Sequence, residues 1–298
     1  SSTSNDPTVN GTRPTRTVTF SVTDANGSSG ANGQQTGTTT SIINITAVND
    51  APTLTTFTVP FASTNEDIEV EITFANLLAQ GDAADIDGTV NAFVIKAVST
   101  GTIKIGTSAG VATAWNASSN ATIDATKKAY WTPASNFNGT LNAFTAVAKD
   151  NDGLESATAV QVVVSVILVN DAPVITTSGS LSYTEAVAAA AIQPSLTLSD
   201  VDDTQITGGS ISLTNPVTGD TLSFTNTGTI TGIFSGGVLT LTGTDTLANY
   251  QAALRTVKFS SISSDPTIKG TRRTRTVTFS VTDANGSTGA NGQQTSTT

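Results

Sequence analysis

The two ends of the chain repeat each other. Residues 1–39 and 260–298 are separated by a constant offset of 259 positions, and only seven of the paired residues differ. The stretch from 15 to 28, ThrArgThrValThrPheSerValThrAspAlaAsnGlySer, recurs unchanged at 274–287. Long repeats of this kind are typical of tandem arrays, in which one structural unit follows another. The sequence therefore predicts one complete unit and an overlap with the next copy.

A shorter repeat marks predicted domain boundaries inside the unit. ValAsnAspAlaPro occurs at 48–52 and again at 169–173, each time directly after an apolar stretch. Proline donates no hydrogen bond to a sheet and restricts the preceding residue, so each copy indicates a domain end and a short stiff link. The predicted parts are the C-terminal part of a preceding second-type repeat (1–52), a β-sandwich domain (53–173) and a second β-sandwich repeat without its last strand (174–298).

Alternating apolar and polar residues predict strands along most of the chain. In residues 17–23, Val and Phe alternate with Thr and Ser, which places the apolar side chains on one face of a strand. Similar short runs separated by Gly and Asn turn signals predict an all-β fold of sandwich domains with Greek-key connections. Two helical turns are predicted, at 74–80 and 246–254, and Asp245 is expected to cap the second.

The composition excludes several classes of function. The chain has no Cys and no His, so it holds no disulfide, no thiolate or imidazole metal site and no Ser-His-Asp triad. A net charge of −10 argues against nucleic-acid binding, which requires Lys and Arg to neutralise phosphates. The longest apolar-rich run, 160–169, is about half of what spans a bilayer, so we expect no membrane insertion in this segment.

Candidate catalytic carboxylates are few. Glu66 with Asp67, and Glu69 with Glu71, are the pairs that lie close in sequence, and both fall in a predicted strand. Catalysis by an acid and a base requires two such groups facing each other in a cleft. The chain is therefore predicted not to be an enzyme.

Aspartates cluster in the predicted turns. AspIleAspGly lies at 85–88, AspAsnAspGly at 150–153 and AspValAspAsp at 200–203, while AspAlaAsnGly occurs at 24–27 and 283–286. Crowded carboxylates repel each other unless a cation joins them, and Ca²⁺ binds six to eight oxygen ligands in flexible geometry. Asp, Asn and Gly also dominate ordinary solvated turns, so a single cluster is compatible with either interpretation. The recurrence of the clusters in both predicted domains favours Ca²⁺.

Several motifs resemble a known class of repeat. Residues 130–173 contain TyrTrpThrPro (130–133), AsnPheAsnGly (136–139), AspAsnAspGly (150–153) and ValAsnAspAlaPro (169–173). In order and spacing these motifs resemble the bacterial cadherin-like tandem repeats of giant surface adhesins, the RTX-type or large repetitive adhesin family. A second repeat type found in such adhesins is similar to residues 182–260, with SerTyrThrGlu (182–185), LeuThrLeuSerAspValAspAsp (196–203) and ThrLeuAlaAsnTyrGlnAlaAlaLeuArg (246–255). The resemblance covers nearly the whole chain and implies Ig/cadherin-like sandwiches in a linear array.

The resemblance also implies a set of Ca²⁺ ligands. Cadherin-like repeats hold the ion between domains with an early Glu of one domain, the Asn-Asp of the link, and an Asp-x-Asp and a later Asp of the next domain. The matching residues at the junction 170–173 are Glu66, Asn170, Asp171, Asp200, Asp202 and Asp283. Those at the junction 49–52 are Asn49, Asp50, Asp85, Asp87 and Asp150.

The sequence departs from eukaryotic cadherins in two places. The acid that lies two residues before the link Asn in those proteins is replaced here by Ala47 and Leu168. Their mid-domain Asp-x-Glu is also missing, and the region holds Asn136 and Asn138 instead. We therefore expect fewer ions at each junction than eukaryotic cadherins bind.

These features predict a structural function. The chain is expected to be a segment of a large bacterial adhesin or filament, secreted or at the cell surface, which forms a Ca²⁺-stiffened stalk. The expected partners are neighbouring repeats of the same chain or filament, together with cell-surface or abiotic ligands. The alternative is a glycan-, ice- or surface-binding module that uses Thr-rich strand faces.

The ends of the sequence leave two interpretations. The chain is either a window of one long polypeptide or a filament subunit whose missing strand is donated by a neighbour. The overlap supplies the strand at 18–22 twice, which favours the window.

Overall fold

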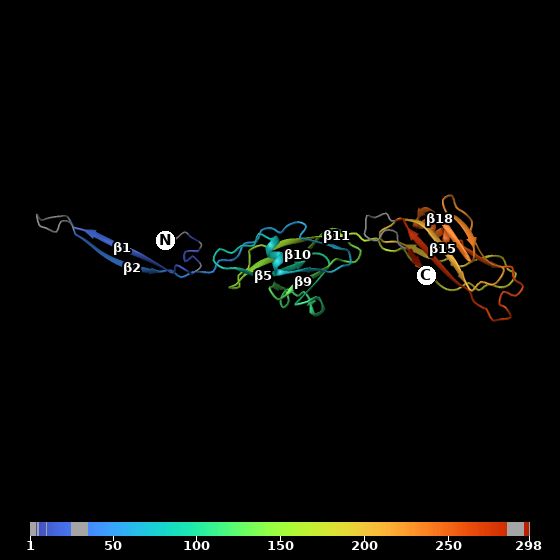
Figure 1. Ribbon diagram of the computed structural model, residues 1–298, viewed down its shortest axis with the longest axis horizontal. Coiled ribbons are helices and arrows are strands. Elements are labelled where there is room, and N and C mark those ends of the chain that lie inside the picture. The colour runs from blue at the N-terminus through green and yellow to red at the C-terminus, as the bar shows by residue number, and fades with distance from the viewer. Residues whose placement is uncertain (1–3, 5, 10, 25–34, 285–294, 298) are drawn as a thin grey trace. The chain divides into compact units, whose positions relative to one another are not determined.

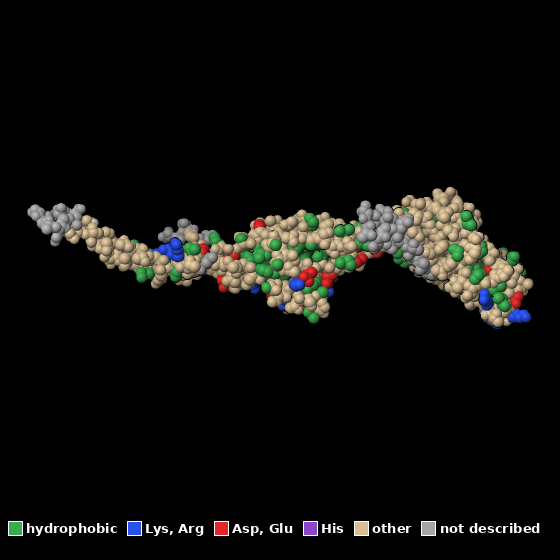
Figure 2. All heavy atoms as spheres, in the orientation of Figure 1, with side chains coloured by type: hydrophobic (Ala, Val, Ile, Leu, Met, Phe, Trp, Pro, Cys, Tyr) green, Lys and Arg blue, Asp and Glu red, His purple; other side chains and the backbone are tan. Residues whose placement is uncertain are grey.

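A computed structural model describes residues 4, 6–9, 11–24, 35–284 and 295–297 (Figure 1). The chain divides into two compact units, Ser1–Val166 and Ile167–Thr298. Strands dominate the described residues of both, which confirms the predicted all-β class. The face drawn in Figure 2 consists mostly of uncharged polar side chains and backbone, in keeping with a charged fraction of 12%.

The first unit begins with a long two-stranded hairpin. Strand β1 (Thr15–Thr23) pairs antiparallel with β2 (Thr36–Asn44), from Thr15 opposite Asn44 to Thr23 opposite Thr36. All side chains of β2, and all but one of β1, are exposed. This hairpin therefore has no core of its own on either face.

The rest of the first unit is a sandwich of two sheets. One sheet contains, in spatial order, β3 (Ala62–Asn65), β11 (Val160–Ile167), β10 (Gly139–Asp150), β5 (Val90–Val98) and β8 (Thr122–Asp124). The other contains β4 (Val70–Ile72), β9 (Lys128–Thr132), β6 (Thr102–Gly106) and β7 (Thr113–Ala114), with the 3₁₀ turn η1 (Ala109–Val111) between β6 and β7. The chain crosses repeatedly from one sheet to the other, and the apolar side chains of both sheets form one continuous core between them.

One helix closes part of this sandwich. Helix α1 (Phe74–Gln80) occupies the residues for which a helical turn was predicted. Thr73 caps it, because its hydroxyl accepts a hydrogen bond from the Asn76 backbone N–H at 3.0 Å while the Asn76 side chain accepts one from the Thr73 N–H. Leu77 is buried, so the helix contributes its inner face to the core.

The second unit is also built from sheets that pack on a shared core. Its largest sheet contains β17 (Thr231–Ser235), β18 (Val238–Thr246), β15 (Gln205–Thr214), β20 (Thr276–Asp283) and β21 (Thr295–Thr297). The opposing strands are β13 (Ala190–Ala191), β19 (Lys258–Ser261) and β16 (Asp220–Ser223) in one sheet, and β12 (Val174–Thr176) with β14 (Thr197–Ser199) in another. Apolar residues from all of these layers form the core.

Helix α2 (Leu247–Arg255) lies where the second helical turn was predicted, but its cap differs from the prediction. Thr246, rather than Asp245, is the N-cap, and its hydroxyl accepts a hydrogen bond from the Asn249 N–H at 3.2 Å. Asp245 instead accepts a hydrogen bond from the Thr246 N–H at 2.8 Å. Tyr250 and Leu254 are fully buried, so this face of the helix packs inward.

The alternating strand that the sequence contains twice is buried only once. In β20, Phe279 and Val281 are 1% and 0% exposed, so the predicted apolar face lies in the core. In β1 the identical residues, Phe20 and Val22, are 55% and 73% exposed. The same local sequence therefore forms a strand in both places, but only the second unit supplies partners for its apolar face.

Candidate metal centre

A cluster of buried carboxylates lies at one end of the second unit. Asp200 and Asp203 lie in the turn between β14 and β15, and Asp283 ends β20, so two segments that are far apart in the sequence bring them together. One carboxylate oxygen from each lies within 4.8 Å of the others. Asp203 and Asp283 are 5% and 0% exposed. Three acidic groups held this closely in a buried place repel each other strongly unless positive charge is present.

The backbone of the turn orients Asp200 within this cluster. Its Oδ1 accepts hydrogen bonds from the N–H groups of Asp202 and Asp203, both at 3.0 Å, which is the usual way in which an Asp closes a short turn. Its Oδ2 is buried and accepts no hydrogen bond among the described residues. Burial, followed by the nearby charges of Asp203 and Asp283, raises the pKa of Asp200 above its ordinary value. A cation beside Oδ2 would offset both effects.

The link between the predicted domains is held by the same group of residues. Asn170, which is 2% exposed, donates a hydrogen bond from Nδ2 to Asp283 Oδ2 at 2.9 Å. The backbone N–H of Asp171 donates one to Asp202 Oδ2 at 2.6 Å. Any change that reorients Asp202 or Asp283 therefore also affects the link.

The first unit contains the same arrangement at the other ValAsnAspAlaPro sequence. Asn49 donates from Nδ2 to Asp150 Oδ2 at 2.9 Å, as Asn170 does to its own strand-end aspartate. The backbone N–H of Asp50 donates to the carboxylate of Asp87 at 3.2 Å. Both contacts match those of the second unit, residue for residue.

Asp85 occupies the place that Asp200 has in the second unit. Its Oδ1 accepts hydrogen bonds from the N–H groups of Asp87 and Gly88 at 3.2 and 3.1 Å. Its Oδ2 is buried and without a hydrogen-bond partner among the described residues, again like that of Asp200. An unsatisfied carboxylate oxygen at the equivalent position of two different domains is a feature that a shared ligand would explain.

The pKa shifts in this first-unit group run in opposite directions. Burial opposes ionisation of Asp150, but hydrogen bonds from Asn49 and from the N–H groups of 152–154 outweigh it and lower the pKa of Asp150. Burial and the neighbouring charges of Asp50 and Asp85 raise the pKa of Asp87. The group therefore combines one stabilised anion, Asp150, with one carboxylate, Asp87, whose ionisation is disfavoured.

The predicted residues fall into two groups and one remainder. Asn49, Asp50, Asp85, Asp87 and Asp150 come together in the first unit, and Asn170, Asp171, Asp200, Asp202 and Asp283 come together in the second. Glu66 lies in the turn after β3 and is 4% exposed, and its predicted role beside Asn170 and Asp171 stays a prediction. Of the two AspAlaAsnGly clusters, residues 25–27 and 285–286 lie outside the described part of the chain.

One residue of the carboxylate cluster was missed by the sequence reasoning. The Asp-x-Asp pattern selects Asp200 and Asp202, whereas the oxygens that approach each other belong to Asp200, Asp203 and Asp283. The turn directs Asp202 toward the backbone of Asp171 and places Asp203 on the buried side, where it is 5% exposed. The only sequence signal was the run of acidic residues itself.

The donor set fits a hard cation with oxygen ligands. Carboxylates, link amides and backbone carbonyls are the usual ligands of Ca²⁺, whereas Zn²⁺ and copper sites normally include His or Cys, which this chain lacks. The residues present therefore fit the cation that the sequence resemblance implies.

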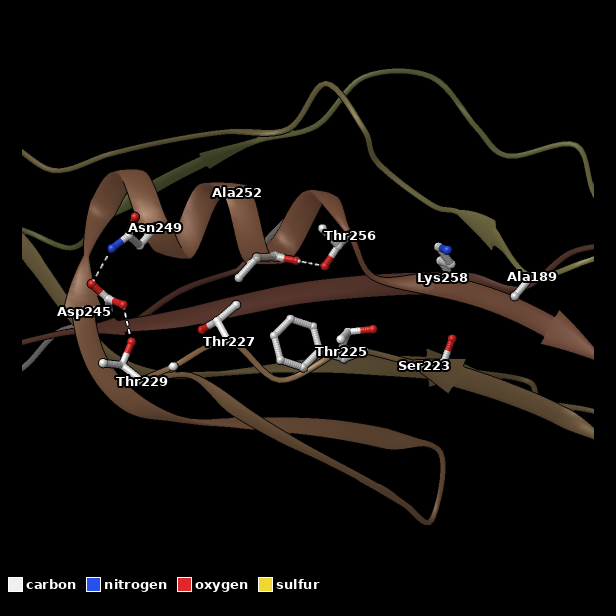
Figure 3. A pocket seen from close by; sticks show the side chains of 13 residues that line it. Ala189, Ser223, Thr225, Thr227, Thr229, Asp245, Asn249, Ala252, Thr256 and Lys258 are labelled. Carbon is white, nitrogen blue, oxygen red and sulfur yellow. Dashed lines mark hydrogen bonds between the residues drawn. The ribbon is translucent and has the colours of Figure 1, made fainter.

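A second candidate site is an open pocket of about 900 Å³ beside α2 in the second unit. It lies between the helix and the segment 223–229, and is lined mainly by Thr, Ser and Ala side chains (Figure 3). Asp245 is the one carboxylate among the described lining residues, and it points toward Thr229 and Asn249, from which it accepts hydrogen bonds. These bonds lower the pKa of Asp245, so the group is ionised, fully engaged and unsuited to act as a general acid.

The other carboxylates considered for catalysis also lack a suitable arrangement. Glu66 and Asp67 lie in the turn after β3 and not in the strand predicted for them. Glu71 lies in β4, where it accepts a hydrogen bond from the Lys128 ammonium group at 2.8 Å. This hydrogen bond, and after it the positive charge of Lys128, lowers the pKa of Glu71.

In the described part of the chain, neither helix is long and apolar enough to cross a membrane.

No protein-family model matches the sequence, and no curated protein matches it in a sequence search. Among solved structures, the PcdhgB3 EC1-4 fragment is 13% identical with a TM-score of 0.40, and the match covers 96% of this chain and 56% of that one. Human CDH23 EC21-23 is 14% identical with a TM-score of 0.33, covering 89% of this chain and 68% of the other. An endo-fucoidan hydrolase from glycoside hydrolase family 107 matches with 12% identity and a TM-score of 0.28, covering 95% of this chain and 33% of that one. Similarities at this level assign no function to the chain.

Proposed function

We propose that this chain is a structural segment of a large extracellular adhesin or filament, whose domain links are made rigid by Ca²⁺. One observation carries the proposal: two domains of different sequence arrange a link Asn, a link Asp and three further aspartates in the same way at each ValAsnAspAlaPro sequence. A solvated turn does not require the same contacts with the link in both domains. A joint that depends on a bound cation does require them, because the aspartates must hold the link in a fixed position.

The chain's own residues would couple the cation to the link. A bound Ca²⁺ would supply the positive charge that the crowded carboxylates of Asp200, Asp203 and Asp283 lack. With those carboxylates fixed, Asp283 holds the side chain of Asn170 and Asp202 holds the backbone of Asp171. The link then loses the rotational freedom that it has when the carboxylates repel each other and move apart.

The role in the cell follows from this joint. A string of domains whose links are fixed behaves as a stiff stalk, and modules outside the cell meet enough Ca²⁺ to fill sites with dissociation constants of about 10⁻⁴–10⁻³ M. We therefore place the protein in secreted or cell-surface structures, with neighbouring repeats as its immediate partners. Ligands on another surface would be bound elsewhere in the assembly.

Calorimetric titration of the 298-residue chain with Ca²⁺ tests the proposal. The native protein is expected to bind with millimolar or tighter affinity, and Asp283→Asn is expected to weaken the second-unit site at least tenfold. Asp265→Asn is the matched control, because it removes the same charge from the exposed loop between β19 and β20. An absence of Ca²⁺ binding, or equal binding by both variants, would contradict the proposal.

A second candidate function rests on the exposed Thr faces of the hairpin. Thr19 lies opposite Thr40 and Thr23 opposite Thr36, and all four are exposed, so their hydroxyls lie along one face of the hairpin. Such a face could bind a glycan or an ordered surface, although the hydroxyls of Thr23 and Thr36 already hydrogen-bond each other at 2.8 Å. Binding to polysaccharide or ice that is lost in Thr19→Val and Thr40→Val would support this candidate, and unchanged binding would dismiss it.

A further inference from the structure

The pocket beside α2 in the second unit lies between two walls of different character (Figure 3). Hydroxyl groups line one wall, and they come from alternate residues of the segment 223–229: Ser223, Thr225, Thr227 and Thr229. The other wall is a face of α2, where Asn249, Ala252 and Ala253 have the spacing of neighbours on a helix surface. Their short side chains leave about 900 Å³ open between the walls, which is the size of a typical ligand pocket.

An aromatic ring forms part of the same lining. Phe224 is partly buried and packs against the core of the second unit. Its ring lies close to the backbone of β17, since a Cβ added at Gly232 would come within 2.7 Å of Phe224 Cδ1. The ring is therefore held in place by the core on one side and by the strand on another.

The end of the pocket at Asp245 is internally satisfied. The Asp245 carboxylate accepts hydrogen bonds from the Thr246 N–H at 2.8 Å, from Asn249 Nδ2 at 2.7 Å and from the Thr229 hydroxyl. Its negative charge is therefore already surrounded by donors. This end contributes shape to the pocket but little attraction for a charged ligand.

The other end carries donors that have no partner. Figure 3 shows Lys258 at the end of the pocket away from Asp245, and Lys258 lies opposite Ser223 in the pairing of β19 with β16. Within the part of the chain that the structure describes, the Lys258 ammonium group makes no ion pair, and the hydroxyls of Ser223 and Thr225 make no hydrogen bond. Thr227 Oγ1 accepts a hydrogen bond from the Ile230 N–H at 3.1 Å, so its own proton remains available for donation. One positive charge and three hydroxyl donors thus face the pocket.

We propose that this pocket binds a saccharide chain that carries an anionic group, either a carboxylate or a sulfate. The anionic group lies beside Lys258 and accepts hydrogen bonds from Ser223 and Thr225, because these donors lack partners and a hydrogen bond to a charged group is stronger than a neutral one. A sugar ring packs its C–H groups against Phe224, whose ring face is electron-rich. Its hydroxyls accept from Thr227 and from the amide of Asn249.

Other ligand classes fit the same lining less well. A wholly apolar ligand would remove Lys258 and the hydroxyl row from water without giving them partners, which is costly. A nucleic acid requires many cations along its phosphates, and Lys258 is the one cation among the described lining residues. The pocket shares no residue with the cluster of Asp200, Asp203 and Asp283, so this inference does not rest on the Ca²⁺ joint.

Calorimetric titration of the 298-residue chain with three sugar hexamers tests the ligand class. The probes are hexagalacturonate, its methyl ester, which is the same sugar without the charge, and a sulfated galactan hexamer. Excess chelator prevents Ca²⁺ from bridging sugar and protein, and a melting curve establishes that the chain is folded in that buffer. At least one anionic hexamer is expected to bind with millimolar or tighter affinity, and the one that binds identifies the anionic group. Binding of neither, or equally tight binding of the methyl ester, would overturn the proposal.

Matched variants test the location of the site. Lys258→Gln removes the charge at the pocket, and Ala252→Leu fills the space beside α2, so each should weaken binding at least tenfold. Lys269→Gln removes an exposed charge outside the pocket, and Ala248→Leu enlarges an exposed residue of α2 that does not line it, so both should bind like the native chain. Lys258 and Ala252 are exposed, and unchanged melting of their variants excludes unfolding as the cause.

Two results would contradict this location. If Lys269→Gln weakened binding as much as Lys258→Gln, the sugar would be held by general attraction to positive charge and not by the pocket. If the hairpin variants Thr19→Val and Thr40→Val abolished binding while Ala252→Leu did not, the sugar would bind on the hairpin face instead.

Discussion

The repeat places one residue type in two environments, which allows an internally controlled test of core packing. Phe279 is 1% exposed and lies opposite Ile211 of β15 in the core of the second unit. Phe20 has the same flanking sequence and is 55% exposed in the hairpin. Removing a buried Phe side chain lowers the free energy of unfolding by about 3–5 kcal/mol, because the favourable burial of the ring is lost and a cavity is left in the core. Removing an exposed one changes stability by roughly 0.5 kcal/mol or less.

The expected result is a selective loss of stability in the second unit. Phe279→Ala should lower the melting temperature of that unit on the order of 10–20 °C, and Phe20→Ala should leave it unchanged. The two units can be followed separately, because both tryptophans, Trp115 and Trp131, belong to the first unit. Tryptophan fluorescence then reports the first unit, and circular dichroism reports both.

Two outcomes would refute this reasoning. If Phe20→Ala destabilised the dilute protein as much as Phe279→Ala, the hairpin would be packed against a core that the structure does not contain. If Phe279→Ala shifted the tryptophan transition equally, the two units would not unfold independently.

Two further predictions concern the second unit. Asp220 and Arg275 form an ion pair at 2.6 Å, with side chains 0% and 11% exposed. Burial opposes ionisation of Asp220, but the hydrogen bonds from Arg275, the Val217 N–H and Ser261, together with the Arg275 charge, outweigh it and lower the pKa of Asp220 below the ordinary 3.8. The stabilisation is therefore present above pH 3.8 and lost as pH falls through the lowered pKa. Arg275→Met should destabilise the unit by roughly 3–5 kcal/mol at pH 7, and by much less at a pH below that lowered pKa, as measured by urea unfolding. An equal effect at both pH values would contradict this. Gly243 has φ +113° and an added Cβ would overlap the Thr229 carbonyl oxygen, so Gly243→Ala should lower the melting temperature measurably. Gly228→Ala, where the added Cβ meets open space, is the control and should be neutral, so similar melting of both variants would refute the argument.

The fold class and the helices were accessible from the sequence because they depend on local patterns. Period-two alternation predicts the strands, and both helices lie at the predicted helical turns, 74–80 and 246–254. The prediction that Asp245 caps α2 was wrong. Thr and Asp are both good N-cap residues, and only the backbone geometry decides between Thr246 and Asp245.

Other features could not be predicted because they depend on residues far apart in the sequence. Asp203 joins the carboxylate cluster because the turn after β14 rotates it inward, and an acidic run does not reveal that rotation. The different burial of Phe20 and Phe279 has no local signal at all, because their neighbours in sequence are identical. Burial there is set by whether β15 lies alongside the strand.

The central claim is that Ca²⁺ fixes the links, and small-angle scattering of the 298-residue chain tests it most directly. Scattering is measured at a concentration where sedimentation finds monomer, in millimolar Ca²⁺ and then in excess chelator. We predict a longer maximum dimension and a narrower distribution of shapes with Ca²⁺, a change that is lost when Asp150→Asn and Asp283→Asn are combined. The same scattering curve in both solutions would contradict the account, because it would mean that the aspartates at the links do not control their stiffness.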